Sequence, residues 1–204
     1  MLSKPVSNAN LPNLLFELPS IVERLDLANL FPKRQPLEVE LGSGDASFLV
    51  DYANQHPERN FIGVERLLGR MRKLDRKGRR AGLTNLRGLR IESGYFLEYL
   101  LPREAASALH VYFPDPWPKK RHLKHRLING RFPELARAAL RPGGVIYLRT
   151  DDADYFEQMA TVFSGFPTFC LIETPLELAA MLTDFERDFR SRGIRTLRTA
   201  YQRD

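Results

Sequence analysis

Short apolar runs alternate with helical patterns along most of this chain. The runs predict strands at 37–41, 60–65, 86–91, 108–113, 145–150, 168–172 and 194–201. Helical spacing of apolar residues predicts helices at about 47–55, 67–78, 97–101, 123–130, 133–140 and 155–163, and a helix or a loop at 176–190. Because helices that alternate with strands form the crossovers of parallel sheets, we expect an α/β fold with a doubly wound, mostly parallel sheet.

The amino-terminal part has a different pattern. Residues 1–16 are rich in Asn, Pro and Ser and show no apolar period, so we expect a flexible or loosely docked arm. A short helical pattern follows at 21–31, and Pro32 and Pro36 end it. At 204 residues, 43% of them hydrophobic, the chain is long enough for one core, so we expect a single domain over 17–204.

Charge and cysteine usage narrow the class of protein. The formal net charge of +6 favours a polyanionic partner such as nucleic acid. Cys170 is the sole cysteine, which excludes an intramolecular disulfide and a cysteine-rich metal site. No stretch approaches the roughly 20 apolar residues needed to cross a bilayer, and the first residues lack the apolar core of a signal peptide. We therefore expect a cytoplasmic protein without a membrane partner.

The loop over 113–122 is the most informative segment. Pro114, Pro116 and Pro118 stiffen its backbone and remove three amide donors. Asp115 and Trp117 alternate with these prolines directly after an apolar strand, at a carboxyl end where open α/β sheets bind ligands. A basic run follows: Lys119, Lys120, Arg121, His122, Lys124, His125 and Arg126. An acid, an aromatic ring and cations at one sheet edge indicate a site for a base attached to phosphates.

Other strand ends carry glycines and acids. Gly42 and Gly44 follow the first strand, where they would let the backbone approach a nucleotide-like ligand. The turn lacks the G-x-G-x-x-G pattern, which disfavours a pyrophosphate. Glu40, Glu65 and Glu92 mark three strand ends, where they suit ribose hydroxyls and an adenine amino group. Any one of these acids could be a solvated charge, but the set predicts S-adenosylmethionine as the cofactor.

Three further features are ambiguous from the residues alone. Asp151 ends the fifth strand beside Asp115, but no histidine has ligand spacing, so we expect no metal. Residues 183–187 favour a helix with an N-cap. The stretch from 66 to 90 contains ten basic residues and one acidic residue, Asp75. That stretch is either a solvated helix face or, together with the loop, a phosphate-binding surface.

Together these motifs resemble the bacterial tRNA (guanine-N7)-methyltransferases, over about 37–203. The loop over 113–126 is the most specific part, and 40–44, 63–65, 142–144 and 183–186 fall in the family's order. The resemblance implies a Rossmann-like class I methyltransferase with a seven-stranded sheet whose last strand is antiparallel. It also implies methyl transfer from S-adenosylmethionine to N7 of a guanosine in the tRNA variable loop.

The resemblance also implies roles for individual residues. Implied cofactor contacts are Glu40, Glu65, Glu92 and Asp115, to which the glycine turn adds Gly42 and Gly44. Implied substrate contacts are Lys119, Asp151, Thr183, Asp184, Phe185 and Glu186, and the RNA-contacting segment is Arg121, His122, Lys124, His125 and Arg126. The chain departs from the family's pattern at Ala46, where glycine is frequent, at Glu92, where Asp is usual, and at Asp184, where Lys is common.

The chemistry of guanine N7 limits what the protein must supply. N7 carries an in-plane lone pair and no proton, so alignment and electrostatics replace a general base. We therefore predict that Asp115 and Asp151 act in catalysis by stabilising charge.

Alternative functions explain less of the chain. A non-catalytic RNA-binding protein on the same scaffold would gain nothing from the strand-end acids. A methyltransferase for a protein or small molecule would leave the basic runs unexplained. A nicotinamide dehydrogenase would need a phosphate-loop glycine, which this chain lacks. The residues are compatible with a monomer or a homodimer.

Overall fold

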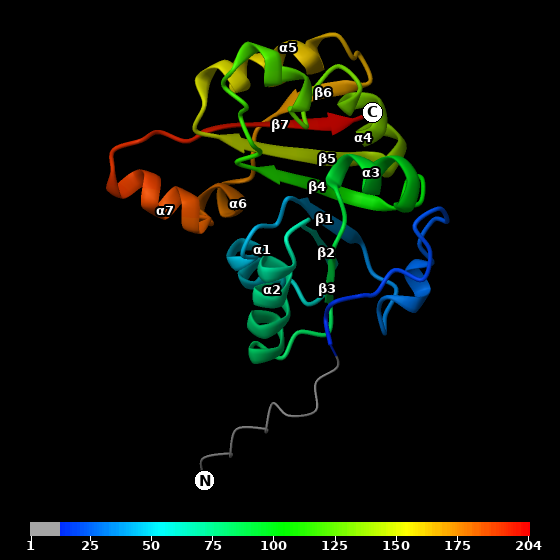
Figure 1. Cartoon of the computed structure of the whole chain (residues 1–204). Helices are drawn as coiled ribbons and strands as arrows, with labels where there is room; N and C mark the ends of the chain where they lie inside the picture. Colours follow the sequence, from blue (N-terminus) through cyan, green and yellow to red (C-terminus); the bar gives the residue numbers. More distant parts are fainter. Residues whose placement is uncertain (1–12) are drawn as a thin grey trace.

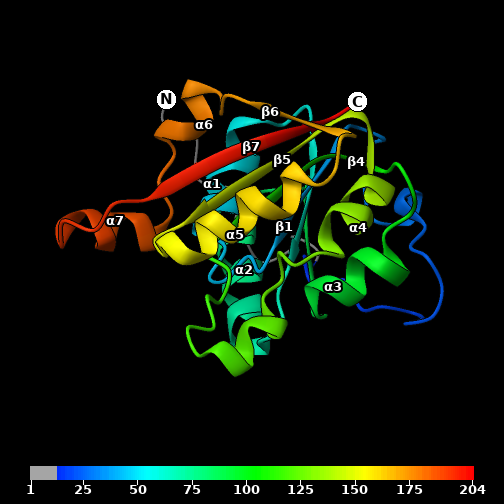
Figure 2. The same ribbon diagram turned by 90° about the horizontal axis from the view of Figure 1, so that it is seen from above.

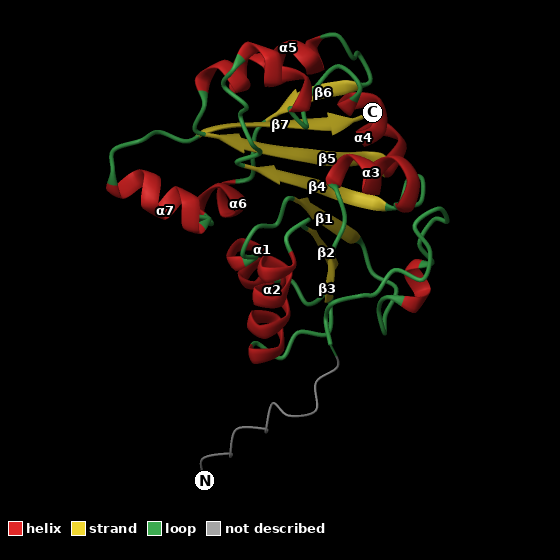
Figure 3. Ribbon diagram, in the orientation of Figure 1, coloured by secondary structure: helices red, strands yellow, loops and turns green. Residues whose placement is uncertain are grey.

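A single seven-stranded sheet runs through the computed structural model, which describes residues 13–204 (Figures 1 and 3). Its strands are β1 (Leu37–Leu41), β2 (Asn60–Val64), β3 (Leu86–Leu89), β4 (Ala106–Tyr112), β5 (Leu140–Thr150), β6 (Phe169–Ile172) and β7 (Leu197–Arg203). The strand order is β3-β2-β1-β4-β5-β7-β6. The first five strands are parallel, whereas β7 is antiparallel to both β5 and β6. This topology confirms the predicted doubly wound sheet with an antiparallel last strand.

Helices connect the strands. They are α1 (Ser47–Gln55), α2 (Leu68–Arg80), α3 (Ser93–Tyr95), α4 (Phe132–Ala139), α5 (Ala153–Ser164), α6 (Leu176–Ala180) and α7 (Asp184–Ser191). Of these, α1, α2, α4 and α5 lie within a few residues of the predicted ranges. A π-helical turn, η3 (Phe96–Leu100), continues α3, and 3-10 turns form η2 (Leu27–Asn29) and η4 (Lys120–His125). Among the described residues, no helix combines the length and apolar character required to cross a bilayer.

Two hydrophobic layers cover the two faces of the sheet. On one face Phe48 and Leu74, from α1 and α2, pack with Phe61. On the other face Phe132 and Met159, from α4 and α5, belong to the larger cluster. Figure 2 shows α5 and α6 on opposite sides of the strands. Because helices cover both faces, the central strands β1 and β2 are buried throughout. The sequence of β2 is a nearly continuous apolar run, whereas β1 also buries two acids, Glu38 and Glu40.

The amino-terminal segment differs from the prediction. In place of a helix over 21–31 the chain forms only η2, and Leu25 donates its N–H to the carbonyl of Leu100. Leu14 is fully buried, and Phe16 donates its N–H to the carbonyl of Gly88 in β3. Residues 13–16 are therefore docked on the sheet, while 1–12 of the predicted arm lie outside the described residues.

The helix predicted over 123–130 is also different. The structure has the η4 turn, followed by irregular chain up to α4. Ile128 donates its N–H to the Tyr155 hydroxyl at 2.9 Å, a tertiary hydrogen bond in place of a helical one. The predicted helix therefore did not form, because tertiary contacts with α5 replace its internal hydrogen bonds.

Candidate active site

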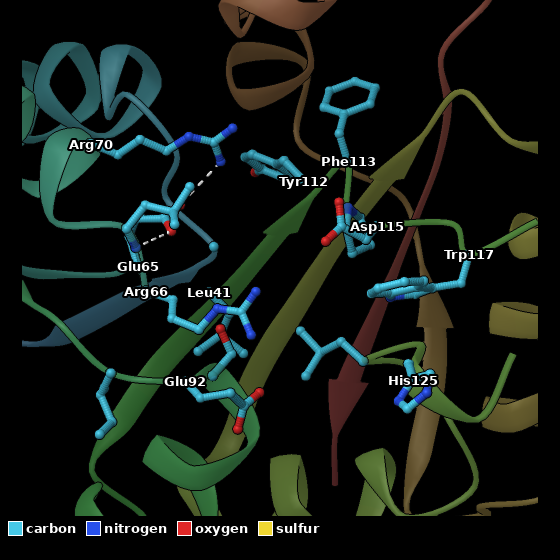
Figure 4. A pocket seen from close by; sticks show the side chains of 16 residues that line it. Leu41, Glu65, Arg66, Arg70, Glu92, Tyr112, Phe113, Asp115, Trp117 and His125 are labelled. Atoms are coloured by element: carbon cyan, nitrogen blue, oxygen red, sulfur yellow. Dashed lines mark hydrogen bonds and ion pairs between the residues drawn. The ribbon is translucent and has the colours of Figure 1, made fainter. Parts of the chain in front are cut away.

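A cavity of about 250 Å³ lies at the carboxyl ends of β1, β2, β3 and β4 (Figure 4). Five sequence-predicted residues line it: Gly42, Glu65, Glu92, Asp115 and His125. Leu41, Ile91 and Leu127 add apolar surface, and Tyr112, Phe113 and Trp117 add aromatic rings. The parallel strand order brings these residues together from four separate loops.

The turn after β1 is shaped by left-handed backbone. Gly42 has φ +76°, Gly44 φ +55° and Ala46 φ +59°. Gly42 and Ser43 both donate their N–H groups to the carbonyl of Val64, which ties the turn to β2. Ala46 keeps the left-handed conformation that a glycine would adopt more easily, at a cost of about 1–2 kcal/mol. Gly42 borders the cavity, whereas Gly44 is buried and forms the turn beside it.

Glu65 and Glu92 enter the cavity in different ways. The buried Glu65 accepts a hydrogen bond from the N–H of Leu67 at 2.8 Å and lies 3.3 Å from an Arg70 guanidinium nitrogen (Figure 4). Glu92 is exposed, and its two oxygens accept hydrogen bonds from the N–H groups of Gly94 at 2.8 Å and Tyr95 at 2.7 Å. A carboxylate oxygen has more than one lone pair, so both acids can still accept from a ligand.

Glu40 was predicted as a cofactor contact, but it lies beneath the cavity surface. It is only 4% exposed, and its Oε2 has no hydrogen-bond partner among residues 13–204. Burial raises the pKa of its carboxyl well above the ordinary value, although the nearby Arg149 acts in the opposite direction. An acceptor buried without a donor is unusual, and a ligand N–H or O–H group would satisfy it.

The proline-rich loop presents Asp115 to solvent at the cavity rim (Figure 4). Phe113 and Trp117 have φ values of +52° and +44°, a left-handed conformation that is costly for large side chains. The Trp117 ring lies 5.4 Å from that of His125 and 5.7 Å from that of His122, measured between centroids. Asp115 is therefore held on a strained loop that an aromatic cluster supports.

The predicted RNA-contacting segment divides into exposed and buried side chains. Arg121, Lys124 and His125 are exposed and His122 is half-buried, as is typical of a surface segment; the predicted substrate contact Lys119, just before this segment, is also exposed. The prediction that Arg126 contacts RNA is wrong for this geometry, because its side chain is only 2% exposed. Its guanidinium donates to the Pro116 carbonyl at 2.6 Å, to Gln158 at 2.7 Å and to Asp154 at 2.6 Å. In this geometry Arg126 anchors the loop to α5, and its burial leaves almost no guanidinium surface for a phosphate.

The segment over 183–186 also divides. Thr183 and Glu186 are buried and form a capping box: Glu186 donates its N–H to the Thr183 hydroxyl at 3.1 Å, and its Oε2 accepts from the N–H of Thr183 at 3.0 Å. These two predicted substrate contacts are therefore structural in this geometry, as the helix-cap interpretation had it. Asp184 and Phe185 are exposed.

Arg149 is an important residue that sequence reasoning missed. It is 1% exposed, and its guanidinium forms an ion pair with Glu186 at 2.7 Å. The same guanidinium stacks on the Tyr112 ring in a cation–π contact, with Cζ 4.2 Å from the ring centroid. It also donates to the carbonyls of Leu178 and Met181. The available signal was a basic residue inside the apolar run over 145–150. Two residues later, the exposed Asp151 follows β5, beside the loop that follows β4.

Comparisons with known proteins place the chain in a family. The family described as "Putative methyltransferase" matches residues 34–199. A tRNA (guanine-N(7)-)-methyltransferase of Syntrophotalea carbinolica is 35% identical over 178 residues, which cover 85% of this chain and 77% of that protein. The chain belongs to the tRNA (guanine-N7)-methyltransferase family. The relative from Alkalilimnicola ehrlichii is 33% identical over 90% of this chain and 78% of its own length.

Solved structures with lower identity show the same fold. The 16S rRNA methyltransferase KamB is 21% identical with a TM-score of 0.62, over 89% of this chain and 95% of that chain. A 30S ribosomal A1408 methyltransferase from an uncultured bacterium is 17% identical with a TM-score of 0.60, over 89% and 96%. These likenesses confirm the class I methyltransferase fold and carry no argument about substrate.

S-adenosylmethionine is the cofactor of this methyltransferase family, and the cavity fits it. Glu65, Glu92 and Asp115 offer acceptors for hydroxyl, amino and ammonium groups, while Leu41 and Ile91 offer apolar surface to an adenine. The unpaired Glu40 oxygen adds a buried acceptor next to this surface. Among the described residues, His, Cys, Asp and Glu form no group of three or more that could hold a metal ion.

Proposed function

We propose that this protein transfers the methyl group of S-adenosylmethionine to N7 of a guanosine in the variable loop of tRNA. One observation carries the proposal beyond family membership: the cavity with its three acids borders the loop that bears Lys119, Arg121 and Lys124. A neutral small substrate would not require that basic surface. The alternative of a non-catalytic RNA-binding protein would not require the acids.

The chain's residues align the base and stabilise charge. When bound, S-adenosylmethionine supplies an electrophilic sulfonium methyl group. Because guanine N7 has no proton to lose, no side chain has to act as a general base. The exposed carboxylate of Asp115 can accept hydrogen bonds from the N1 and N2 donors of guanine, and it stabilises the positive charge that develops on the ring. We assign Asp151, after the neighbouring strand, a second charge-stabilising role.

Exposed basic side chains would bind the tRNA backbone. Arg121 and Lys124 lie on η4, on the loop that carries Asp115. The outer face of α2 adds Arg72, Lys73, Arg76 and Arg80. Phosphate contacts of this kind fix the position of the tRNA without reading its sequence. We further propose that the reaction takes place in the cytoplasm and that the protein acts as a monomer or a homodimer, which light scattering would distinguish.

The decisive experiment combines activity with mapping of the modified base. The protein is incubated with methyl-labelled S-adenosylmethionine and an unmodified tRNA transcript, and the tRNA is then cleaved at 7-methylguanosine. We expect a single cleavage site in the variable loop. A transcript with that guanosine replaced by adenosine is the control and should stay unlabelled. Label on another base would refute the proposed position, and cofactor binding by calorimetry without any label would favour the RNA-binding alternative.

A further inference from the structure

A polar contact joins two segments that are distant in the sequence and have different predicted ligands. The Ser47 hydroxyl at the start of α1 lies 2.5 Å from Oδ2 of Asp184, the first residue of α7. Ser47 directly follows the glycine turn that borders the cofactor cavity. Asp184 lies in the exposed part of the segment predicted to contact the substrate. Figure 1 shows α7 next to α1.

A lysine from a third element completes this cluster. Lys77 of α2 places its ammonium 2.6 Å from Oδ2 of Asp45 and 2.5 Å from the Ser47 hydroxyl. It also donates to the backbone carbonyl of Asp45 at 3.1 Å. Asp45 in turn accepts from the N–H of Ser47 at 3.2 Å, which leaves the single hydroxyl proton of Ser47 for Asp184. We call the side chains of Asp45, Ser47, Lys77 and Asp184 the clasp.

The clasp holds a turn whose backbone is costly. Asp45 stands between Gly44 and Ala46, which both have positive φ. A non-glycine residue such as Ala46 keeps that conformation only when its surroundings enforce it. Lys77 contributes to this by contacting both the side chain and the carbonyl of Asp45, in addition to the hydrogen bonds that tie Gly42 and Ser43 to β2.

The other contacts of α7 lie deeper in the molecule. Glu186 pairs with the buried Arg149, and Phe189 packs against Phe113 with ring centroids 5.4 Å apart. The clasp instead joins the first turn of α7 directly to the cofactor turn. Side chains that order two ligand-binding segments together make binding at one segment favour binding at the other.

We propose that Asp184 is a positioning residue that couples the cofactor turn to the substrate-facing end of α7 through Ser47 and Lys77. The inference rests on the proposed function, because it assigns tRNA to the α7 side of the site. It predicts that tRNA binds more tightly to the cofactor-loaded protein than to the free protein.

The coupling is measurable as a ratio of dissociation constants. Binding of tRNA is titrated with and without S-adenosylhomocysteine, the unreactive product of the cofactor. We expect the wild-type protein to bind tRNA about fivefold more tightly with this ligand, at the lower end of typical coupling. Asp184→Ala and Ser47→Ala should each bring the ratio below twofold, and the double variant should do no more than either single one. Ser47→Thr keeps a hydroxyl and should retain the coupling.

A matched control lies on the same helix. Asp188 is exposed and pairs with Arg192, the residue directly after α7, so Asp188→Ala removes an acid without touching the clasp. This variant should keep the wild-type ratio. A wild-type ratio in Asp184→Ala, or equal losses in Asp184→Ala and Asp188→Ala, would overturn the inference.

A second readout separates the clasp from the proposed function. Hydrogen exchange of the α7 amides is followed on the protein alone, without tRNA or cofactor. We expect faster exchange in Asp184→Ala and Ser47→Ala than in the wild type or Asp188→Ala. If the wild-type protein failed to methylate tRNA while this exchange pattern held, the function would be wrong and the clasp would stand. Unchanged exchange would refute the clasp whatever the activity.

Discussion

The loop over 113–126 and the segment over 176–191 lie at the same edge of the sheet, and each is held by one buried arginine. Arg126 fixes the loop to α5 through Asp154 and Gln158. Arg149 fixes α6 and α7 through Glu186 and two backbone carbonyls. The exposed residues differ: the loop presents Asp115 and cations, whereas the segment presents Asp184 and Phe185. In both regions, therefore, a polar motif combines an internal anchor with side chains that are exposed at the surface.

The largest expected effect comes from breaking the anchor of α7. Glu186→Ala leaves the Arg149 guanidinium buried without its acid, which should lower the free energy of unfolding by about 3–5 kcal/mol. Urea unfolding measures the change. The exposed Asp184→Ala is the control and should lose less than about 1 kcal/mol. Equal losses in both variants would mean that the anchor is not what distinguishes the two acids.

Removing the exposed acid of the loop should affect turnover instead. We expect Asp115→Ala to lower kcat about 100-fold or more, because a group aimed at developing charge is lost, while the tRNA dissociation constant stays within about twofold. Asp151→Ala should behave in the same way. Single-turnover methylation and filter binding separate these quantities, with the exposed Glu157→Ala of α5 as control. Wild-type turnover in either variant would remove that residue from the mechanism.

The cations of the loop should affect binding moderately. Arg121→Gln combined with Lys124→Gln should weaken tRNA binding and reduce the slope of log affinity against log salt by about 0.7–0.9 per contact. Arg103→Gln removes an exposed charge just before β4, at the opposite edge of the sheet, and should leave the slope unchanged. Arg126→Gln should lower stability and leave the slope nearly intact. A loss of slope in Arg126→Gln would mean that this residue reaches the RNA after all.

The smallest effect concerns Lys77 and the pH dependence of stability. Burial acts to raise the pKa of Asp45, but hydrogen bonds from Lys77 and Ser47 outweigh it and lower the pKa to about 2, from an ordinary 3.8. A depressed carboxyl pKa stabilises the fold above the unfolded-state pKa, and this stabilisation is lost as the pH falls through the folded-state pKa. Lys77→Met should therefore be less stable than the wild type by under about 1 kcal/mol above pH 4, a difference that disappears near pH 2. Urea unfolding across this range, with the exposed Lys73→Met as control, tests the assignment, and a difference independent of pH would contradict it.

Much of the fold was predictable because its signals are local. Apolar runs and helical spacing gave β1, α1, β2, α2 and α5 within a few residues of their observed bounds. The predicted helix over 21–31 failed because Leu25 and Leu30 bury themselves by packing on η3 without a full helical turn. Residues 13–16 dock beside β3 because Leu14 fills the space above Gly78 of α2, which a Cβ at that position would occupy.

By itself the sequence determined the parallel α/β order, and with it the meeting of Gly42, Glu65, Glu92 and Asp115 at one edge of the sheet. That outcome needs only strand order and the position of each residue at a strand end. The tertiary structure decided which polar side chains turn inward. Burying a charged side chain is costly unless a partner lies within hydrogen-bonding distance, and such partners come from distant elements, as Glu186 does for Arg149 and Asp154 for Arg126. No local sequence pattern shows which distant residues will become partners. The division between anchors and ligand contacts therefore appeared only in the folded protein.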